Sequence, residues 1–446
     1  MTPKLLDLQR GALDRTVFVD RELYELELER IFAKTWVLLT PESAIANPGD
    51  YVQASIGEDP VVVSRSADGS IHAFLNSCSH RGNKVCQFER GNTETFVCPY
   101  HGWRYDVEGR LTNVPFHKGA YRSRLDFSQL GLRRVARVQA YGGLVFGCWD
   151  ADAPDLENYF GDAAWYLDNL VLNTWSEGLE CVSHRYSYTI RTNWKTIAAN
   201  ASGDHYHTMF THGSLYKLGL ADPSGHHEQE QQPHGPFVVS VRGGHTVGSL
   251  YVGEAHYERD LAKARKLDMS PEVIEYIHDR YRRKCAAMTD VPAKPYKCSF
   301  GLIFPTTMWS SSGGALDGRG IYTFSPRGTD ETVFSQWLFV DRDAPQEVKD
   351  LGTQTHGDFG QLATGFFGQD DAENYERIAE LSHPYLARQT PLNISMGLGD
   401  EGRWPDMHTW QIEGLPGQVG PGLTEHAERA FYQQWMDTLG IGGSGL

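Results

Sequence analysis

Four residues of metal-binding types, arranged as two short pairs, constrain this chain more than any other feature. The first pair is Cys78 and His80, the second is Cys98 and His101, and seventeen residues separate the two pairs. Two thiolates and two imidazoles can hold a [2Fe–2S] cluster, with one iron on the Cys pair and one on the His pair, or a tetrahedral zinc ion. Zinc fingers usually group Cys with Cys and His with His, whereas both pairs here are mixed. The mixed order favours the cluster, a one-electron carrier.

The sequence around the two pairs predicts a small all-β domain over residues 39–155. Alternating apolar residues mark strands such as 51–56 and 71–78, and the latter runs directly into the first Cys/His pair. Gly82 and Gly102 follow the two pairs and supply the tight turns that would fold two loops around a cluster.

The remaining residues, 1–38 and 156–446, predict a second domain of α+β type. Strand-like segments such as 301–309 are mixed there with helical segments such as 371–382. Residues 1–38 show a helical period and are expected to pack on this larger part of the chain.

Composition excludes several classes of partner. The chain carries 41 Lys and Arg against 57 Asp and Glu, a net charge of −16, which argues against binding to nucleic acid or to an anionic membrane surface. No apolar run approaches the roughly 18 residues of a membrane span, and the N-terminus lacks the apolar core of a signal peptide. A cytoplasmic protein is therefore expected. Seven Cys, two of them in the cluster motif, do not suggest a disulfide framework.

A second group of metal-binding residue types consists of Asp204, His207 and His212. Two imidazoles and one carboxylate form the facial triad of non-haem Fe(II) oxygenases, which leaves positions open for O₂. Two of those three ligands, His207 and His212, are visible here. Asp204 and His207 would be i, i+3 neighbours on a helix, and Gly213 would end that helix and turn His212 toward the metal. Two His five residues apart are more often structural when they stand alone. Beside a one-electron carrier, which needs an electron acceptor, they favour an iron site.

Both motifs resemble those of Rieske non-haem iron aromatic-ring-hydroxylating dioxygenases, in their large (alpha) subunits of the naphthalene, biphenyl and polycyclic aromatic type. The stretches CSHRG and CPYHGW resemble the Rieske cluster signature of that family, and NWK followed by GDHYHTMFTH resembles its iron motif. The similarity runs from about residue 15 to 435. It implies a Rieske β-domain and a helix-on-antiparallel-sheet catalytic domain of the helix-grip, START-like kind.

The resemblance also implies the metal ligands. The cluster would be held by Cys78, His80, Cys98 and His101. The mononuclear iron would be bound by His207, His212 and a carboxylate from far along the chain. Alignment of the segment GFFGQDDAENYER makes Asp371 that ligand, with Asp370 as the alternative. Either acid also suits the N-cap of the helix that follows.

Asp204 has a different role in the resembled family. It would lie between His101 of one copy and His207 of the neighbouring copy, orient His207 and link the two metals. Copies joined head to tail would close into a ring, most simply a trimer. One position departs from the family pattern: Ala199 stands where those enzymes often have Glu.

A largely apolar and aromatic set of side chains is expected to line the substrate pocket. Its members are Asn200, His205, Met209, Phe210, Phe300, Trp309, Phe359, Phe366 and Phe367. Such walls suit a flat aromatic substrate. Naphthalene-like hydrocarbons, biphenyls and aromatic carboxylates all remain open.

The implied reaction inserts both atoms of O₂ into an aromatic ring to give a cis-dihydrodiol. Electrons would come from NADH through a separate reductase and ferredoxin, in agreement with the lack of a Gly-rich dinucleotide motif. The implied assembly is a trimer of alpha subunits, or an α3β3 complex with a small beta subunit. Two alternatives stay open: a Rieske monooxygenase or demethylase with the same metals, and an electron carrier without catalysis.

Overall fold

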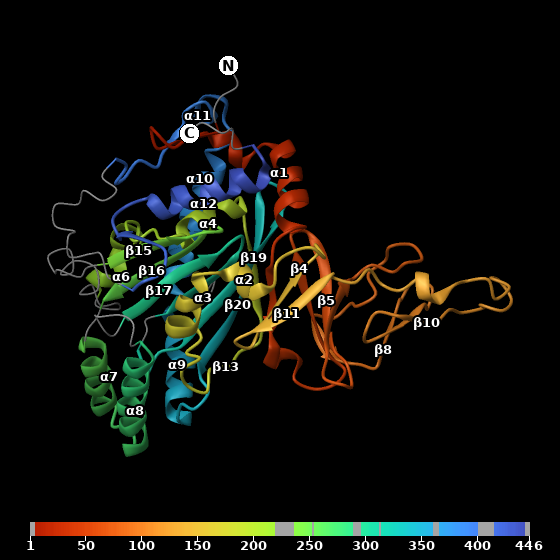
Figure 1. Ribbon diagram of the computed structural model, residues 1–446, viewed down its shortest axis with the longest axis horizontal. Helices are drawn as coiled ribbons and strands as arrows, with labels where there is room; N and C mark the ends of the chain where they lie inside the picture. Colours follow the sequence, from red (N-terminus) through yellow and green to blue (C-terminus); the bar gives the residue numbers. More distant parts are fainter. Residues whose placement is uncertain are drawn as a thin grey trace. The chain divides into compact units, whose positions relative to one another are not determined.

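The computed structural model describes residues 5–218, 236–251, 254–288, 296–311, 314–359, 365–399 and 414–441. The chain divides into two compact units: Leu28–Leu156, and Met1–Glu27 together with Glu157–Leu446. Figure 1 colours both along the sequence, with the first unit in orange tones. Among the described helices, none is long and apolar enough to cross a membrane.

The unit of residues 28–156 is built from three small antiparallel sheets. Their strand orders are β6-β5-β4-β7, β11-β12-β3 and β10-β9-β8. The strands are β3 (Val37–Pro41), β4 (Asp50–Ile56), β5 (Asp59–Arg65), β6 (Ile71–Leu75), β7 (Arg90–Asn92), β8 (Thr95–Val97), β9 (Arg104–Asp106), β10 (Leu111–Asn113), β11 (Arg137–Tyr141) and β12 (Leu144–Cys148). Gly69 turns the chain between β5 and β6 with a positive φ of 86°. The prediction of an all-β fold here is confirmed.

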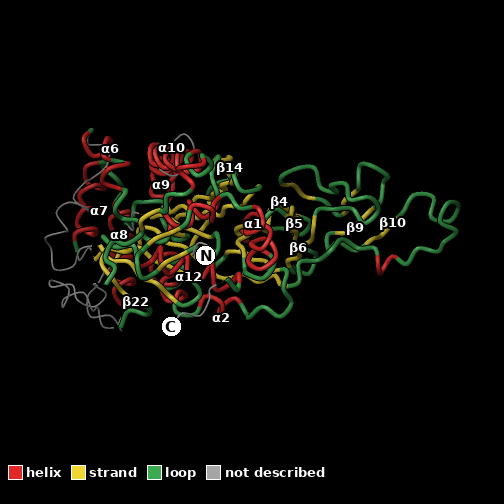
Figure 2. The backbone as a smooth tube through the Cα atoms, turned by 90° about the horizontal axis from the view of Figure 1, so that it is seen from above, coloured by secondary structure: helices red, strands yellow, loops and turns green. Residues whose placement is uncertain are grey.

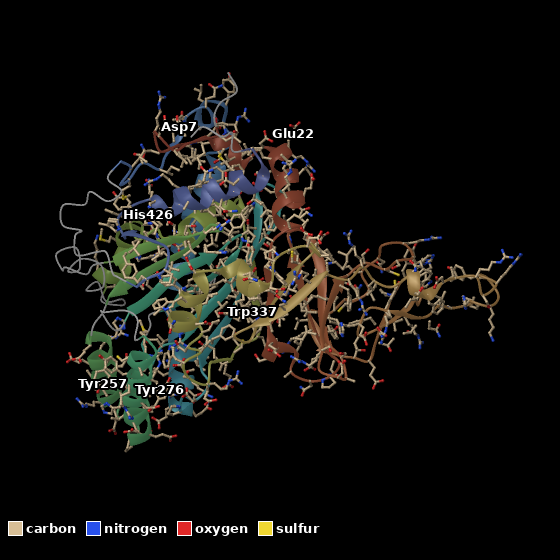
Figure 3. The ribbon with its side chains drawn as sticks, in the orientation of Figure 1. Asp7, Glu22, Tyr257, Tyr276, Trp337 and His426 are labelled. Carbon is tan, nitrogen blue, oxygen red and sulfur yellow. The ribbon has the colours of Figure 1, made fainter. Side chains whose placement is uncertain are left out.

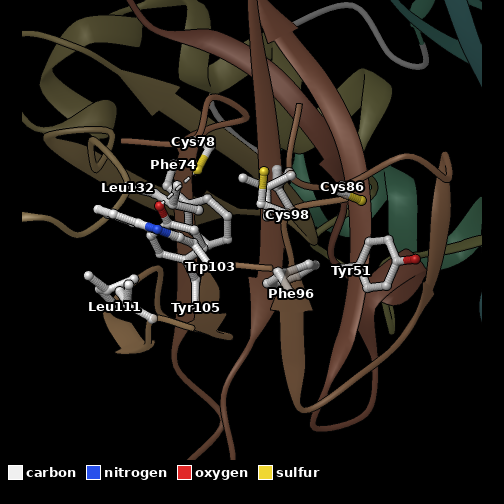
Figure 4. Close-up of a cluster of buried hydrophobic side chains, with 13 residues drawn as sticks. Tyr51, Phe74, Cys78, Cys86, Phe96, Cys98, Trp103, Tyr105, Leu111 and Leu132 are labelled. Atoms are coloured by element: carbon white, nitrogen blue, oxygen red, sulfur yellow. Dashed lines mark hydrogen bonds between the residues drawn. The ribbon is translucent and has the colours of Figure 1, made fainter. Parts of the chain in front are cut away.

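An aromatic core underlies the Cys/His loops of this unit. Phe96 packs edge-to-face on Tyr51 and on Phe74, with ring centroids 5.2 and 5.6 Å apart. Figure 4 shows the sulfur atoms of Cys78 and Cys98 among these buried rings. Both loops are therefore anchored by cysteines that belong to the buried core of this unit.

The larger unit contains a nine-stranded antiparallel sheet. Its order is β13-β20-β19-β18-β17-β16-β15-β22, and β14 also pairs with β20. The strands are β13 (Leu179–Cys181), β14 (Tyr186–Ile190), β15 (Pro236–Val241), β16 (His245–Tyr251), β17 (Tyr296–Ile303), β18 (Thr307–Ser311), β19 (Arg319–Arg327), β20 (Glu331–Asp341) and β22 (Gln418–Pro421). A separate small sheet joins β1 (Leu6–Asp7), β2 (Ala12–Leu13) and β21 (Leu392–Asn393).

Helices pack on this sheet, as Figure 2 shows in red against yellow. The longer helices are α1 (Arg21–Glu27), α4 (Trp194–Ala201), α7 (Ala255–Lys266), α8 (Pro271–Ala287), α9 (Gln346–Phe359), α10 (Phe366–Glu380) and α12 (His426–Leu439). Helix α12 lies against β15 and β16, α4 against β17 and β19, and α10 against β14. The prediction of a helix-on-antiparallel-sheet domain is confirmed.

The buried carboxylate of Asp341 attaches helix α8 to the sheet. Figure 3 labels Tyr257 on α7 and Tyr276 on α8. Asp341, at the end of β20, accepts hydrogen bonds from the Tyr276 hydroxyl (2.8 Å), Arg280 Nε (2.5 Å) and Arg319 Nη1 (2.7 Å). Burial alone would raise the pKa of Asp341, but the two guanidinium groups hold it well below its usual range.

A second buried carboxylate, Glu27 at the end of α1, ties three helices together. Its Oε1 accepts from Lys195 Nζ (2.5 Å) and Trp435 Nε1 (2.8 Å), and its Oε2 accepts from Trp194 Nε1 (2.7 Å). The ammonium of Lys195 also lies over both indole rings, 5.2 and 5.5 Å from their centroids. Glu27 thereby holds the first turn of α4, the helix that leads into the Asp204–His212 segment.

Candidate metal centres

The two Cys/His loops have the same backbone design. The amide of Gly82 donates to the carbonyl of Cys78 (2.8 Å), and the amide of Gly102 donates to the carbonyl of Cys98 (2.9 Å). Both glycines are left-handed, with φ of 73° and 74°. An L residue with a side chain would strain either turn, so the glycines in the sequence motif are explained by the loop geometry.

The structure brings the four predicted cluster ligands together. The thiols of Cys78 and Cys98 are buried and within hydrogen-bonding reach of each other, and the rings of His80 and His101 are 4.5 Å apart. The Tyr105 hydroxyl lies 3.2 Å from Cys78 Sγ. Burial raises the pKa of the Cys78 thiol, and the hydrogen bond from Tyr105 acts in the opposite direction.

The imidazole of His80 is suited to bind a metal. Its ring stacks flat on Trp103, with centroids 5.0 Å apart and 3° between the planes. Its Nδ1 is buried and has no hydrogen-bond partner among the described residues. Burial, together with His101 and Arg81, lowers the pKa of His80 and favours the neutral form that metals bind. A buried, neutral and unpaired ring nitrogen beside two thiols fits an iron–sulfur cluster.

The helix expected through Asp204 and His207 is interrupted, which corrects the sequence prediction. Helix α4 ends at Ala201, and α5 (Thr208–Thr211) begins only after His207. The break falls at Gly203, whose φ is 139° and whose Cβ, if present, would lie 2.8 Å from the Val238 side chain. Asp204 and His207 therefore occupy a turn and not a continuous helix.

Gly213 also differs from its expected role. It does not stop a helix but begins the next one, α6 (Gly213–Lys217). Helix α5 ends one residue before His212, whose backbone is no longer helical. This change of direction between two short helices accounts for the position of His212 beside His207.

Two histidines and one aspartate converge in the larger unit. Asp371, on α10, places its Oδ1 atom 3.5 Å from His207 Nε2 and 3.3 Å from His212 Nε2. One ligand atom from each residue lies within 4.8 Å of the other two. Asp371 and His212 are buried, and His207 is nearly so. Two imidazole nitrogens and one carboxylate oxygen this close together fit a mononuclear iron that keeps positions open.

The other nitrogen of each histidine faces a different partner. His207 Nδ1 lies 3.3 Å from Asp204 Oδ2 and 3.1 Å from the side-chain amide of Asn200. His212 Nδ1 lies 3.4 Å from Asp370 Oδ2. Such Nδ1 contacts fix the ring orientation and leave Nε2 for the metal. Burial lowers the pKa of His207, but the hydrogen bond and charge of Asp204 outweigh it.

Asp370 and Asp371 are thus placed differently with respect to the two histidines. Only Asp371 faces both Nε2 atoms. Asp370 is more exposed and contacts the Nδ1 atom of His212. The contact of Asp370 with His212 was not foreseen from the sequence. Tyr375, buried one turn after Asp371, was also missed, although the helical period places it on the same face of α10.

Two of the expected pocket residues, Asn200 and Phe367, contact the histidines of the iron site. Phe367 packs edge-on to His212, with ring centroids 4.6 Å apart. His205 is buried, and its ring lies 4.7 Å from that of Phe300. Trp309 on β18 is buried in the sheet core.

Phe210 does not behave as a buried pocket wall. Its side chain is 70% exposed and contacts Tyr206, because residue 210 falls on the outward face of the short helix α5. Met209 beside it is partly buried. Phe359 and Phe366 belong to α9 and α10, but their side chains lie outside the described residues.

Comparison with known families agrees with both sites. Residues 35–134 match the Rieske [2Fe-2S] domain, and residues 164–440 match the catalytic domain of the ring hydroxylating alpha subunit. The chain belongs to the ring-hydroxylating alpha subunits. Biphenyl dioxygenase subunit alpha of Paraburkholderia xenovorans (strain LB400) is 35% identical to it, over 97% of this chain and 92% of that protein. The large oxygenase component of the naphthalene 1,2-dioxygenase system of Pseudomonas aeruginosa is 33% identical, over 93% and 89%.

Solved structures of this family have the same fold. Naphthalene 1,2-dioxygenase from Rhodococcus sp. bound to indole superposes with a TM-score of 0.80 and 32% identity, covering 97% of this chain and 95% of that one. A quaternary ammonium Rieske monooxygenase superposes with a TM-score of 0.66 at 16% identity, which shows a shared fold alone.

A ring-hydroxylating alpha subunit carries two metal groups, a Rieske [2Fe–2S] cluster and a mononuclear iron. The residues present suit both. The unpaired Nδ1 of His80 beside two buried thiols meets the needs of the cluster. The convergent atoms of His207, His212 and Asp371 meet those of the iron.

Proposed function

We propose that this chain is the large subunit of a terminal oxygenase that inserts both atoms of O₂ into an aromatic ring and releases a cis-dihydrodiol. The observation that carries the proposal is the buried triad of His207, His212 and Asp371 in a chain that also has a Rieske domain. A triad leaves positions open for O₂, and a Rieske cluster delivers single electrons. The electrons come from NADH through a separate reductase and ferredoxin.

The proposal includes specific ligands for both metals. The cluster is held by Cys78, His80, Cys98 and His101. The iron is bound by His207, His212 and Asp371, because only this carboxylate faces both Nε2 atoms. We assign the cluster domain to residues 28–156 and the catalytic domain to residues 1–27 with 157–446; the first boundary lies earlier than the sequence suggested, because β3 pairs with β12 in the cluster domain.

The protein's own residues orient ligands and exclude water. The bound iron supplies the activation of O₂, and the chain supplies position and a dry surrounding. Asp204 and Asp370 hold the Nδ1 sides of His207 and His212, which keeps both Nε2 atoms aimed at one point. Phe367 covers one edge of His212 and shields that side of the site from solvent.

Asp204 links the two metals between neighbouring copies. It holds His207 on one side, and its side chain is 28% exposed, so it can also accept a hydrogen bond from outside its own unit. His101 of a second copy is the partner that this role requires. A head-to-tail ring, a trimer of this chain or an α3β3 complex with a small beta subunit, satisfies that geometry.

Mixed assemblies test the path between copies. Copies with His80→Ala lack a cluster, and copies with His207→Ala lack the iron, so each variant alone is expected to be inactive. In a verified mixed oligomer some interfaces pair an intact cluster with an intact iron, and partial activity is expected to return. No return of activity would indicate that electrons move within one chain.

The substrate is an uncharged aromatic hydrocarbon in this proposal. The relatives named above act on biphenyl and naphthalene, and the ring of Phe367 lies against the iron-site residue His212. Asn200, close to His207, is the polar exception. Contacts of this kind differ by only small free energies between one orientation of the substrate and another. The position at which the ring is oxidised therefore has to be measured from the products.

Turnover under labelled O₂ tests the reaction itself. The purified protein, supplied with ferredoxin, reductase and NADH, is expected to convert naphthalene or biphenyl to a diol that contains two labelled oxygen atoms. A product with one labelled atom would identify a monooxygenase. Reduction of the cluster without any product from a panel of aromatic compounds would identify an electron carrier.

A further inference from the structure

A buried glutamine in the sheet of the larger unit lacks hydrogen-bond partners. Gln336 lies in the middle of β20 and is 2% exposed. Neither its amide nitrogen Nε2 nor its amide oxygen Oε1 has a partner among the described residues. Burying an unpaired amide costs folding free energy, because water satisfies both atoms in the unfolded chain. An amide of this kind requires a partner from outside the chain, either a water molecule or a ligand.

The register of the sheet identifies the face that carries Gln336. Successive residues of a strand point to opposite faces, so residues two apart share a face. One row of direct cross-strand partners starts two residues beyond Gln336 and consists of Leu338, Gly320, Ser310 and Phe300. The ring of Phe300 lies 4.7 Å from that of His205, in the segment that carries the iron histidines. Gln336 is therefore on the same sheet face as Phe300, toward the iron-binding segment.

A second set of contacts leads from this face to the carboxylate of the iron site. Phe334, two residues before Gln336, packs against the ring of Tyr188, with centroids 5.4 Å apart. Burial raises the pKa of Tyr188, and the nearby Tyr322 and Asp371 raise it further. The neighbours of Gln336 thus connect it to both parts of the iron site, the histidine segment and Asp371.

The polar group on the neighbouring strand bonds elsewhere. Tyr322 on β19 is the direct cross-strand partner of Gln336, yet its hydroxyl lies 2.7 Å from Ser310 Oγ. The lack of a side chain at Gly320 makes room for this hydroxyl, with which a Cβ would collide. The chain therefore pairs Tyr322 with Ser310, and the amide of Gln336 keeps both its donor and its acceptor available.

We propose that Gln336 binds an uncharged group of the substrate that offers a donor and an acceptor side by side, so that the enzyme takes aromatic lactams as well as plain hydrocarbons. The inference rests on the proposed function and adds a polar group to its substrate. A lactam N–H donates to Oε1 while the lactam carbonyl accepts from Nε2, which pairs both open atoms. A carboxylate would accept from Nε2 but place a negative charge against Oε1. A hydrocarbon pairs with neither atom.

The probe is 2-quinolone, which has two fused six-membered rings and one lactam edge; naphthalene is its hydrocarbon counterpart. A lactam edge held at Gln336 leaves the carbocyclic ring for oxidation. One double bond of that ring takes up both atoms of O₂, two electrons and two protons and becomes a cis-diol. NADH and one proton supply these electrons and protons, and NAD⁺ is released. The expected product carries its diol on the carbocyclic ring.

Replacing Gln336 with Met removes both hydrogen-bonding atoms from a side chain of similar length. Calorimetry of protein loaded with both metals measures the dissociation constants of 2-quinolone and naphthalene. In Gln336→Met the constant for 2-quinolone is expected to rise about ten-fold or more relative to that for naphthalene, because two hydrogen bonds are lost. Equal changes in the two constants would overturn the proposal.

Thr323→Val is the matched control. Thr323 is buried on β19, its hydroxyl also lacks a partner among the described residues, and it follows Tyr322, so it lies on the opposite face from Gln336. The ratio of the two dissociation constants is expected to change less than about two-fold, because Thr323 cannot reach a ligand on the Gln336 face. A shift as large as that of Gln336→Met would contradict the assignment.

Stability distinguishes a binding role from a structural one. If Gln336 binds substrate, its amide is unpaired in the free protein, and Gln336→Met is expected to raise the urea concentration at which half of the protein unfolds. A lower midpoint would assign the amide to a buried water molecule that holds the fold together, and the proposal would then be wrong.

The unaltered protein provides an independent test. 1-Methyl-2-quinolone lacks the N–H donor and is expected to bind about five-fold more weakly than 2-quinolone, a difference that should disappear in Gln336→Met. Equal affinities for the two compounds would reject the proposal even if no variant folded. Failure of the proposed function is distinct, because naphthalene would then give no diol. Failure of this inference leaves the diol from naphthalene and removes only the effect of Gln336 on the choice of ligand.

Discussion

Replacing Glu27 with Gln is expected to destabilise the larger unit severely. The carboxylate is fully buried and faces Lys195, which is 1% exposed, at 2.5 Å. The amide keeps an acceptor for one indole N–H but removes the charge that compensates the ammonium. Removing one partner of a buried ion pair costs about 3–5 kcal/mol. That is a large fraction of the roughly 5–15 kcal/mol by which a typical protein is stable.

Urea unfolding measures this cost. The indole N–H groups of Trp194 and Trp435 donate to Glu27, and both rings are buried. Tryptophan fluorescence therefore changes when this part of the protein unfolds. The double variant Glu27→Gln with Lys195→Met removes both charges at similar volume, and it is expected to recover at least half of the lost stability. Arg377→Gln, which breaks an exposed ion pair on α10, is expected to cost less than about 1 kcal/mol. A loss below about 1 kcal/mol for Glu27→Gln, or an equal loss in the double variant, would refute the reasoning.

Three further predictions follow from the sites. Asp371→Ala is expected to remove the iron and keep the cluster, whereas Asp370→Ala keeps the iron with about ten-fold weaker affinity; metal analysis and the reduced-cluster spectrum distinguish these outcomes. Tyr105→Phe removes a donor to the Cys78 sulfur and is expected to lower the cluster potential by ~40 mV, from about 1 kcal/mol for one hydrogen bond. Asp341→Asn is expected to destabilise the protein at neutral pH. Because the folded pKa of Asp341 is depressed, the difference from the original protein should persist down to about pH 4 and shrink as pH falls further.

The cluster site could be predicted from the sequence because its determinants are local. Each Cys and His pair sits on one turn, and the left-handed Gly82 and Gly102 that close these turns lie within a few residues of the ligands. Turns of this kind require particular residues at fixed positions, so they can be recognised in the sequence. The same reasoning identified His207 and His212 as a pair, while their helix was placed wrongly.

The iron site could be predicted only in part because its remaining determinants are distant. The helix breaks at Gly203, whose φ is 139°, and Val238 on β15 leaves no room for a Cβ there, which no local pattern reveals. Asp371 was found through a family alignment and not from spacing, and the Asp370 contact with His212 spans 158 residues. Strand order is equally non-local, since β15 pairs with β22 far along the chain. Such contacts are selected by packing in three dimensions and have no sequence period.

The two iron histidines differ in how their orientation is secured, and the difference assigns a special role to α10. His207 takes its Nδ1 contact from Asp204, three residues away in the same turn. His212 takes its contact from Asp370, the residue next to the carboxylate that faces both Nε2 atoms. A displacement of α10 would therefore remove a ligand and the partner of a second ligand at once, whereas His207 would keep its orientation. Iron binding should consequently depend more steeply on the position of α10 than on that of α4.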